Sequence, residues 1–175
     1  MKIKLFPAVL LLLILSSCNN KMLFTWDLKQ KIDQRELDLQ KVQFYNSDKI
    51  TLRRVLPHNE AVVAEDTIKF EDGQYIEEII IKKETPGICE EASDFDLNIS
   101  FEPGNNKTIA FSLNKLDKTY ELNVAKRGNE KGRIVYDSMV YVVQADKQLP
   151  KLMIEKNDVY IYKVDQRILK GRKVN

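Results

Sequence analysis

Apolar and polar residues alternate along most of the chain, and the alternation is strictest in two segments near its middle. In FDLNISFE (95–102) every second residue is apolar, and TIAFSL (108–113) repeats the pattern. Residues alternating in this way lie on opposite sides of an extended strand. The intervening Pro-Gly-Asn-Asn (103–106) supplies turn residues. The pattern therefore predicts two half-buried strands joined as a hairpin.

Other short runs follow the same period of two and are rich in Val, Ile, Tyr and Phe, which strands favour. Turn-forming residues separate several of them, for example Asn46-Ser47-Asp48 and Gly73. Short strands at this spacing, with no helical stretch between them, predict a mainly β fold, with antiparallel sheets arranged as a β-sandwich or barrel-like. The further runs span 42–45, 49–56, 67–72, 74–83, 119–124, 133–136, 139–144, 151–155 and 159–164.

One segment ahead of these strands has a helical period. Leu28, Ile32 and Leu39 fall on one face of a helix, and most of the surrounding residues are charged. Asp27 with Gln30 three residues later fits a capping box at a helix start. We therefore expect one short surface helix at about 27–38, with its charges in solvent.

The first residues of the chain carry a third pattern. Lys2 and Lys4 precede an apolar stretch (5–15) that is too short to cross a bilayer, which needs about 20 apolar residues. A basic start, a short apolar core and small residues at its end are typical of an export signal. The four residues that end this N-terminal segment, Leu15-Ser16-Ser17-Cys18, resemble the lipobox of bacterial lipoproteins. A plain signal peptide, or a short anchor with an incidental cysteine, is the alternative.

The lipobox resemblance, which covers only the beginning of the chain, implies a covalent lipid anchor. It implies removal of the signal peptide (1–17), diacylglycerol on the Cys18 thiol and acylation of the new N-terminus. Several acyl chains on one residue hold a protein on a membrane effectively permanently. Asn19 and Asn20, rather than Asp, follow Cys18, and the resemblance then implies the outer membrane. Which leaflet the protein occupies stays open.

The remaining residues are enough for one domain with a proper core. We expect a short lipidated tether at 18–26 and a single β-rich domain at 27–175. A tether of this length keeps the domain close to its membrane. Leu23, Phe24 and Trp26 lie either at the lipid interface, where Trp is favoured, or on the protein's own core.

Charge excludes one class of function. The chain has 28 Lys and Arg against 26 Asp and Glu, and loss of Lys2 and Lys4 with the signal makes the two equal. Without a global basic field, nucleic-acid binding is not expected. The C-terminal end is nevertheless locally basic, and a frayed tail is the alternative to a binding role there. Trp26 and these C-terminal residues are the candidate partner contacts: Arg167, Lys170, Arg172 and Lys173.

Few residues could carry chemistry. With Cys18 lipidated, Cys89 is the only thiol, and it is either buried or available to a partner. The single histidine, His58, cannot build a multi-histidine zinc site or supply a triad by itself. We therefore expect no catalytic residues, no metal site and no cofactor.

Paired carboxylates are the remaining candidates for catalysis, because two acids can serve as the catalytic pair of a glycosidase. The acidic residues cluster in one region without calcium-loop spacing, so a solvated acidic loop is the preferred interpretation. They are Glu84, Glu90, Glu91, Asp94 and Asp96.

The sequence thus favours a non-enzymatic, membrane-anchored lipoprotein that acts through protein contacts in an envelope assembly. In size, anchor and β-rich character it resembles the small outer-membrane lipoproteins of trans-envelope machines such as type VI secretion systems. The alternative is a carbohydrate-binding or other ligand-binding lipoprotein, with an aromatic platform drawn from the tyrosines at 136, 141, 160 and 162. An exposed apolar patch would favour the first function, and a deep pocket the second.

Overall fold

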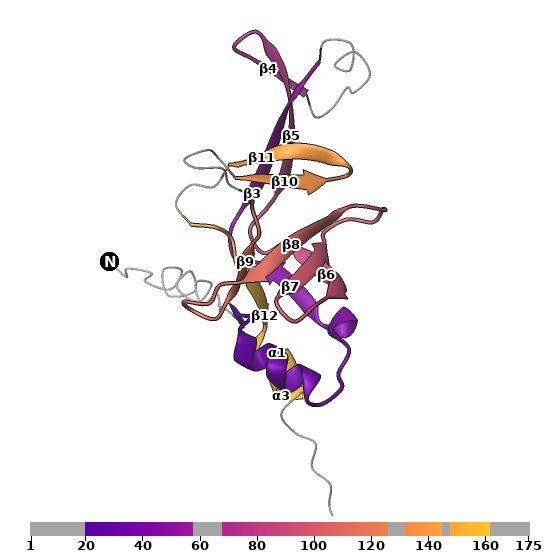
Figure 1. The fold of residues 1–175 in the computed structure, drawn as a ribbon, viewed down its shortest axis with the longest axis vertical. Coiled ribbons are helices and arrows are strands. Elements are labelled where there is room, and N and C mark those ends of the chain that lie inside the picture. The colour runs from indigo at the N-terminus through magenta and orange to yellow at the C-terminus, as the bar shows by residue number, and fades with distance from the viewer. Residues whose placement is uncertain (1–19, 58–67, 126–131, 145–147, 162–175) are drawn as a thin grey trace, which may run out of the picture.

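The computed structural model describes residues 20–57, 68–125, 132–144 and 148–161, with side chains up to residue 158. They form two antiparallel sheets in a sandwich-like arrangement, with a short helix near the N-terminus, so the predicted mainly β fold is confirmed (Figure 1). In spatial order, the seven-stranded sheet consists of β1 (Lys21–Leu23), β12 (Leu152–Glu155), β2 (Gln43–Asn46), β6 (Pro86–Ala92), β7 (Asp96–Ser100), β8 (Thr108–Leu113) and β9 (Tyr120–Leu122). The five-stranded sheet consists of β10 (Arg133–Tyr136), β11 (Met139–Gln144), β3 (Ile50–Leu56), β5 (Gln74–Ile81) and β4 (Ile68–Glu71). The helices are α1 (Trp26–Asp33), the 3-10 helix η2 (Leu39–Lys41) and α3 (Lys156–Ile161).

The seven-stranded sheet curls until its ends meet, and we call it, with its core, the body. The Leu122 N–H of β9 donates to the Pro150 carbonyl at 2.8 Å, and Glu121 pairs with Lys151 just before β12. Because strands enclose the interior, its apolar side chains are removed from water, which is the main stabilising term in folding. The fully buried residues include Phe24, Phe44, Leu97, Ile99, Phe111, Tyr120, Leu152 and Ile154.

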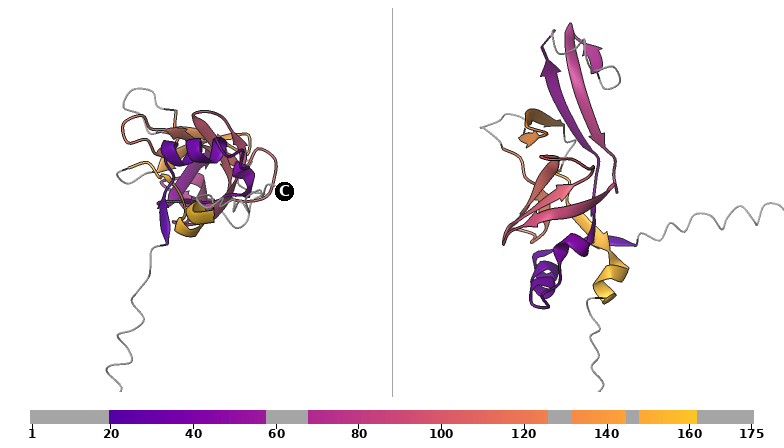
Figure 2. Two further views of the ribbon diagram at one scale, coloured as in Figure 1. Left: turned by 90° about the horizontal axis from the view of Figure 1, so that it is seen from below. Right: turned by 90° about the vertical axis from the view of Figure 1, so that its right-hand side faces the viewer.

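Strands β3, β4 and β5 of the other sheet extend away from the body, and we call them the arm. β3 pairs with β5 over its whole length, from Ile50 opposite Ile81 to Leu56 opposite Tyr75. Ile50 and Ile81, at the base, belong to the core, whereas Phe70 of β4 is exposed. Two views at right angles show the arm at one end of the molecule and α1 and α3 at the other (Figures 1 and 2).

Asn46, the last residue of β2, lies where the chain crosses between the sheets. Its side chain is fully buried and donates to the carbonyls of Asp48 and Lys82, at 2.6 and 2.8 Å. Its Oδ1 accepts the Thr85 N–H at 2.9 Å. The turn residues predicted at 46–48 therefore form the crossing between the two sheets. The Asn46 side chain supplies hydrogen bonds that backbone groups at this crossing would otherwise lack.

The predicted hairpin at 95–113 is confirmed as β7 and β8, which pair in register from Asp96–Ser112 to Ser100–Thr108. Leu97, Ile99 and Phe111 point into the core, as the alternation requires. The outermost apolar residues of the predicted strand 95–102 are not in the core: Phe95 is exposed and Phe101 is only half-buried.

The N-terminal helix is shorter than the predicted 27–38. α1 begins at Trp26 and ends at Asp33, and its cap is Thr25, whose hydroxyl accepts the Leu28 N–H at 3.4 Å. The expected cap at Asp27 is therefore wrong. The helix stops early because the chain reverses, and Glu36 takes a left-handed conformation with φ 53°.

This reversal carries Leu39 into the core as part of η2, beside Ile32 of α1. The expectation that the helix charges are all in solvent is wrong at Lys29, which is buried. Its Nζ lies 2.7 Å from the Asp33 carboxylate one turn along. A buried ammonium needs such a partner.

The chain joins the fold earlier than the expected boundary at residue 27. Lys21 to Leu23 form β1, which pairs with β12 from Lys21–Glu155 to Leu23–Met153. Phe24 is fully buried, its ring edge-on to Phe44 at 5.1 Å. Of the two alternatives for this segment, Phe24 therefore packs in the protein's own core and the half-buried Trp26 packs against it, whereas Leu23 is exposed. The predicted tether at 18–26 is part of the fold from Lys21 onward.

Two further segments differ from the predicted elements. The region predicted to be a solvated acidic loop contains β6, a central strand between β2 and β7. The strand predicted at 159–164 is wrong for the residues described, because 156–161 form the helix α3.

Candidate functional site

Several residues singled out from the sequence fall outside the described ranges. These are Cys18, His58, Arg167, Lys170, Arg172 and Lys173. Trp26 is described: it opens α1, half-buried, and its ring stacks on Phe95 at 5.7 Å with an interplanar angle of 15°.

Cys89 is buried in β6, which is the first of the two alternatives expected for it. Its thiol donates to the Glu91 carbonyl at 3.3 Å. Burial is the main cause that raises its pKa to about 11, and the nearby carboxylates of Asp38 and Glu90 contribute less. A thiol of such high pKa is a poor nucleophile at neutral pH.

The acidic residues do not converge on a site. Glu84 forms an ion pair with Lys21 at 3.1 Å, and Asp96 accepts a hydrogen bond from the Ser112 hydroxyl. Glu91, on β6, accepts from the Asn98 side-chain amide at 3.0 Å. Within the described ranges, no three or more His, Cys, Asp or Glu residues lie together so that they could hold a metal ion.

The tyrosines proposed for an aromatic platform lie in the core where they are described. Tyr136 and Tyr141 are buried, and their hydroxyls donate to Glu102 at 2.8 Å and to Glu77 at 2.9 Å. Burial, reinforced by these bonds, raises the pKa of Tyr136 and raises that of Tyr141 to about 12. The side chains at 160 and 162 lie outside the described residues.

The feature that stands out is the outer face of the five-stranded sheet. Val135 is paired with Val140 across β10 and β11, and Val55 with Ile76 across β3 and β5. We call these four residues the apolar row. Val135, Val140 and Val55 are 66%, 56% and 54% exposed, although the outward side of an antiparallel sheet is normally polar.

A balanced set of charges lies beside the apolar row. Arg53 contacts Glu71 at 2.5 Å and Glu78 at 3.2 Å, and Lys69 also contacts Glu78. The hydrogen bond from Lys69 is the main cause that lowers the pKa of Glu78. With two positive and two negative groups, this part of the face carries no net charge.

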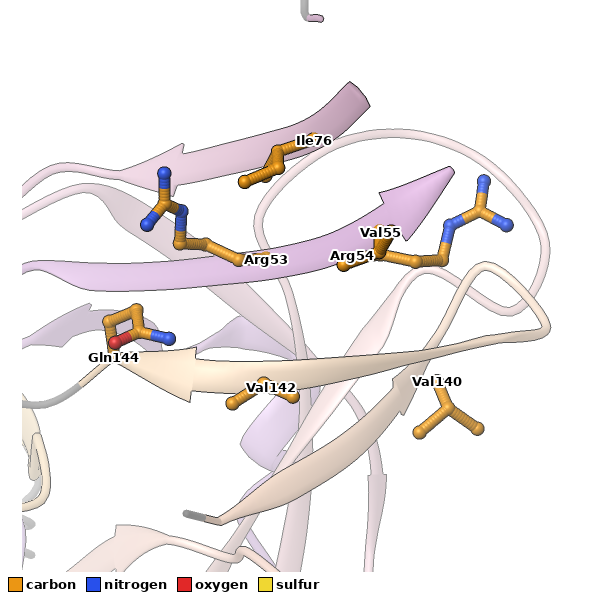
Figure 3. Close-up of a pocket in the computed structure, with 7 residues that line it drawn as sticks. All are labelled: Arg53, Arg54, Val55, Ile76, Val140, Val142 and Gln144. Carbon is orange, nitrogen blue, oxygen red and sulfur yellow. The ribbon is translucent and has the colours of Figure 1, made fainter. Parts of the chain in front are cut away.

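The apolar row borders an open groove of about 520 Å³. Figure 3 shows its lining side chains on three neighbouring strands. They are Arg53, Arg54 and Val55 on β3, Ile76 on β5, and Val140, Val142 and Gln144 on β11. The groove lies on the surface of a sheet rather than inside the body, and aliphatic side chains dominate its middle. Such a surface suits the contact with another protein.

The sequence contains a signal for this face in β5. QYIEEIII in β5 has isoleucines on both sides of the strand, because Ile76 and Ile80 alternate with Ile79 and Ile81. A strand that is apolar on both sides belongs to a sheet that is covered on both sides. In the structure Ile81 is buried whereas Ile80 is 50% exposed, so one side lacks its cover.

Within the part of the chain that the structure describes, no helix has the length and apolar character needed to cross a membrane. Comparison of the chain with protein-family models, with curated proteins and with solved structures gives no significant match.

Proposed function

We propose that this protein is a non-enzymatic lipoprotein of the outer membrane that acts through protein contacts in an envelope assembly, of which a secretion apparatus is one example. The observation that carries the proposal is the apolar row on the outer face of the five-stranded sheet. Contiguous exposed apolar surface mostly marks a site of interaction with another molecule.

The lipobox-like Leu15-Ser16-Ser17-Cys18 supports the membrane part of the proposal. The first strand begins at Lys21, only three residues after Cys18. Three residues span at most roughly 10 Å, at about 3.3–3.6 Å each. A lipid on Cys18 would therefore hold the body directly against the bilayer, and the arm would extend away from it.

The form of the groove favours a protein over a small ligand as the bound molecule. Ligand sites are usually concave, with a few polar groups converging on the ligand. Here the surface is an open strand face, and its charges pair with one another. The described tyrosines of the carbohydrate alternative are buried, which argues against that alternative.

In-cell photo-crosslinking tests the proposal. A photoreactive amino acid at Val140, on the apolar row, should give a protein adduct of one defined mass. The matched control is Ile88 of β6, which is 51% exposed against 56% for Val140, but lies on the body. Val55→Asp, at another exposed position of the row, should abolish the Val140 adduct without unfolding the protein, because it places an unpaired charge in the contact.

Adducts of the same protein from Val140 and Ile88 would show that the row has no special role. A glycan or lipid bound at Val140, with no protein adduct, would overturn the proposal in favour of ligand binding. Recovery of the protein in the soluble fraction, with a free Cys18 thiol, would overturn its membrane part.

A further inference from the structure

Three apolar side chains come from separate segments that meet at the start of α1, the helix at the end of the molecule opposite the arm (Figures 1 and 2). Trp26 opens α1, Phe95 lies just before β7, and Leu116 lies in the turn between β8 and β9. We call them the footing. Trp26 and Phe95 stack at 5.7 Å, and Phe95 and Leu116 are 53% and 97% exposed.

Backbone bonds fix the footing in place. The Trp26 N–H donates to the Lys118 carbonyl at 2.8 Å, which ties the helix start to the Leu116 turn. The Leu116 N–H donates to the Asn114 side chain at 2.9 Å, and the Lys118 N–H to the Asn114 carbonyl at 2.8 Å. The turn is therefore closed on itself and presents Leu116 at its tip.

At this position Leu116 contributes little to the stability of the fold. Burying a leucine side chain is worth about 1.5–3 kcal/mol, and a leucine that is almost fully exposed gains almost none of this. Scattered exposed apolar residues are ordinary. Here, however, the exposed leucine lies on a turn whose backbone bonds to Trp26, the residue that opens α1 and stacks on Phe95.

The footing lies close to the membrane attachment proposed above. Trp26 follows Lys21 by five residues, and Lys21 follows Cys18 by three. Cys18 is thus within roughly 30 Å of Trp26 along even a fully extended chain, at about 3.3–3.6 Å per residue. Trp side chains favour the interface between lipid and water.

We propose that the footing rests in the interfacial layer of the bilayer to which Cys18 is attached. The inference deepens the proposed function and rests on it, because the lipid on Cys18 brings the bilayer to this face. The acyl chains supply the attachment and the footing sets the orientation. Because the arm and α1 lie at opposite ends of the molecule (Figure 2), the arm would then point away from the membrane.

Charge does not drive this contact. Lys115 and Lys118 are exposed on the turn, and Asp27 and Asp94 are exposed next to the two aromatic residues. Both signs are present, so anionic headgroups gain little from this surface. We therefore expect apolar insertion to persist in high salt, unlike attachment through a basic patch.

Trp26 is the only tryptophan of the chain, so its fluorescence reports on this site alone. The test uses the acylated full-length mature protein, taken from cell membranes and reconstituted in phosphatidylethanolamine–phosphatidylglycerol vesicles. Some vesicles carry bromine atoms near the carboxyl ends of the acyl chains. We expect these to quench roughly half of the Trp26 fluorescence, since interfacial side chains reach about 5–10 Å into the headgroup and acyl boundary.

The matched control moves the single tryptophan to the far end of the molecule. In Trp26→Phe with Phe70→Trp, the reporter lies on the arm at a position that is 65% exposed, and we expect no quenching. A second variant, Leu116→Ser, changes only an exposed tip and should lower the quenching of Trp26 while the protein still floats with the vesicles.

The outcomes separate the two proposals. Protein that floats with the vesicles but whose Trp26 is not quenched would overturn the footing and leave the lipid anchor intact. Equal quenching at Trp26 and at position 70 would also overturn it, because the molecule would then lie flat. If the acylated protein does not float with the vesicles, both the lipid anchor and the footing are overturned.

Discussion

The body and the arm use the same kind of strand but hold it in place differently. In the body, one side of the curled sheet encloses fully buried residues such as Phe44, Ile99 and Leu152. In the arm, only the base of β3 and β5 packs on the core, and the outer part is linked by ion pairs such as Arg54–Glu77 at 2.9 Å and Arg53–Glu71 at 2.5 Å.

This difference assigns the stability of the fold to the body and the exposure of apolar side chains to a partner to the arm. Apolar burial is worth about 25 cal/mol per Å² and is the main favourable term in folding. Ion pairs on a surface are worth only about 0–1 kcal/mol each. The body should therefore carry most of the free energy of folding, while the arm keeps apolar side chains in solvent, where a partner can reach them.

The largest expected effect comes from removing the same side chain in each region. Phe24→Ala should lower the free energy of unfolding by about 3–5 kcal/mol, because Phe24 is fully buried and packs on Phe44. Phe70→Ala, on the arm, should cost less than about 1.5 kcal/mol, since it loses mainly its contact with Tyr75. Denaturant unfolding of the two variants measures both values, and equal losses would contradict the division into body and arm.

An intermediate effect is expected at the crossing between the sheets. Asn46→Ala should cost roughly 1–3 kcal/mol for the buried backbone groups that it leaves unpaired. These groups include the Lys82 carbonyl and the Thr85 N–H, at the end of β5 and before β6. Asn123→Ala, at an exposed position, is the control and should be nearly neutral. A neutral Asn46→Ala would show that the crossing does not depend on this side chain.

The smallest effect is a pH dependence confined to the arm. The bond from Lys69 lowers the pKa of Glu78 below its ordinary value of 4.5. The stabilisation is therefore present above about pH 4.5 and is lost as the pH falls through the lower pKa of the folded state. Solvent screening should keep it at about 0.2–1 kcal/mol. Amide protection factors of β4 and β5, with the intrinsic exchange rate at each pH divided out, should fall in acid before those of β7 and β8.

Glu78→Gln supplies the control for the acid effect. The amide cannot change its charge, so the exchange of β4 and β5 should no longer show this acid step. If the body and the arm of the unaltered protein lose protection at the same pH, the ion pairs of the arm contribute nothing measurable.

The sequence predicted elements well where the side chains alternate cleanly, as in β7 and β8. It missed β6, PGICEEA, where the buried positions are Gly87 and Cys89 and the exposed ones include Ile88 and Glu90. A side chain at Gly87 would lie 2.7 Å from Ile99, so this strand needs a glycine where patterns look for a large apolar residue. Its neighbours β2 and β7 decide that it is a strand.

The error at 159–164 has a similar cause. The last described pairs of β12 join Glu155 to Lys21 of β1 and Ile154 to Phe44 of β2. The Lys156 N–H, at the start of α3, still donates to the Asn20 carbonyl beside β1 at 2.7 Å, and the pairs described with β1 and β2 go no further. A helix satisfies its own backbone groups there, whatever the strand propensity of Val159 and its neighbours.

The candidate surface could be predicted only in part. Isoleucines on both sides of β5 indicate a strand covered twice, but not which side is left open. The body covers the side of Ile81, and the described structure leaves Ile80 and the apolar row exposed. Likewise, the footing joins Trp26, Phe95 and Leu116, which are far apart along the chain, so no local pattern could unite them.

The sequence by itself determined the β-rich composition, the main hairpin and the lipobox-like segment, because each depends on residues that are close neighbours along the chain. Only the tertiary structure decided that Lys21 already belongs to the sheet, that the acidic segment is a central strand, and that one sheet face stays apolar and open. These features depend on which strands come together across the chain, and strand pairing is set by long-range packing rather than by local preference.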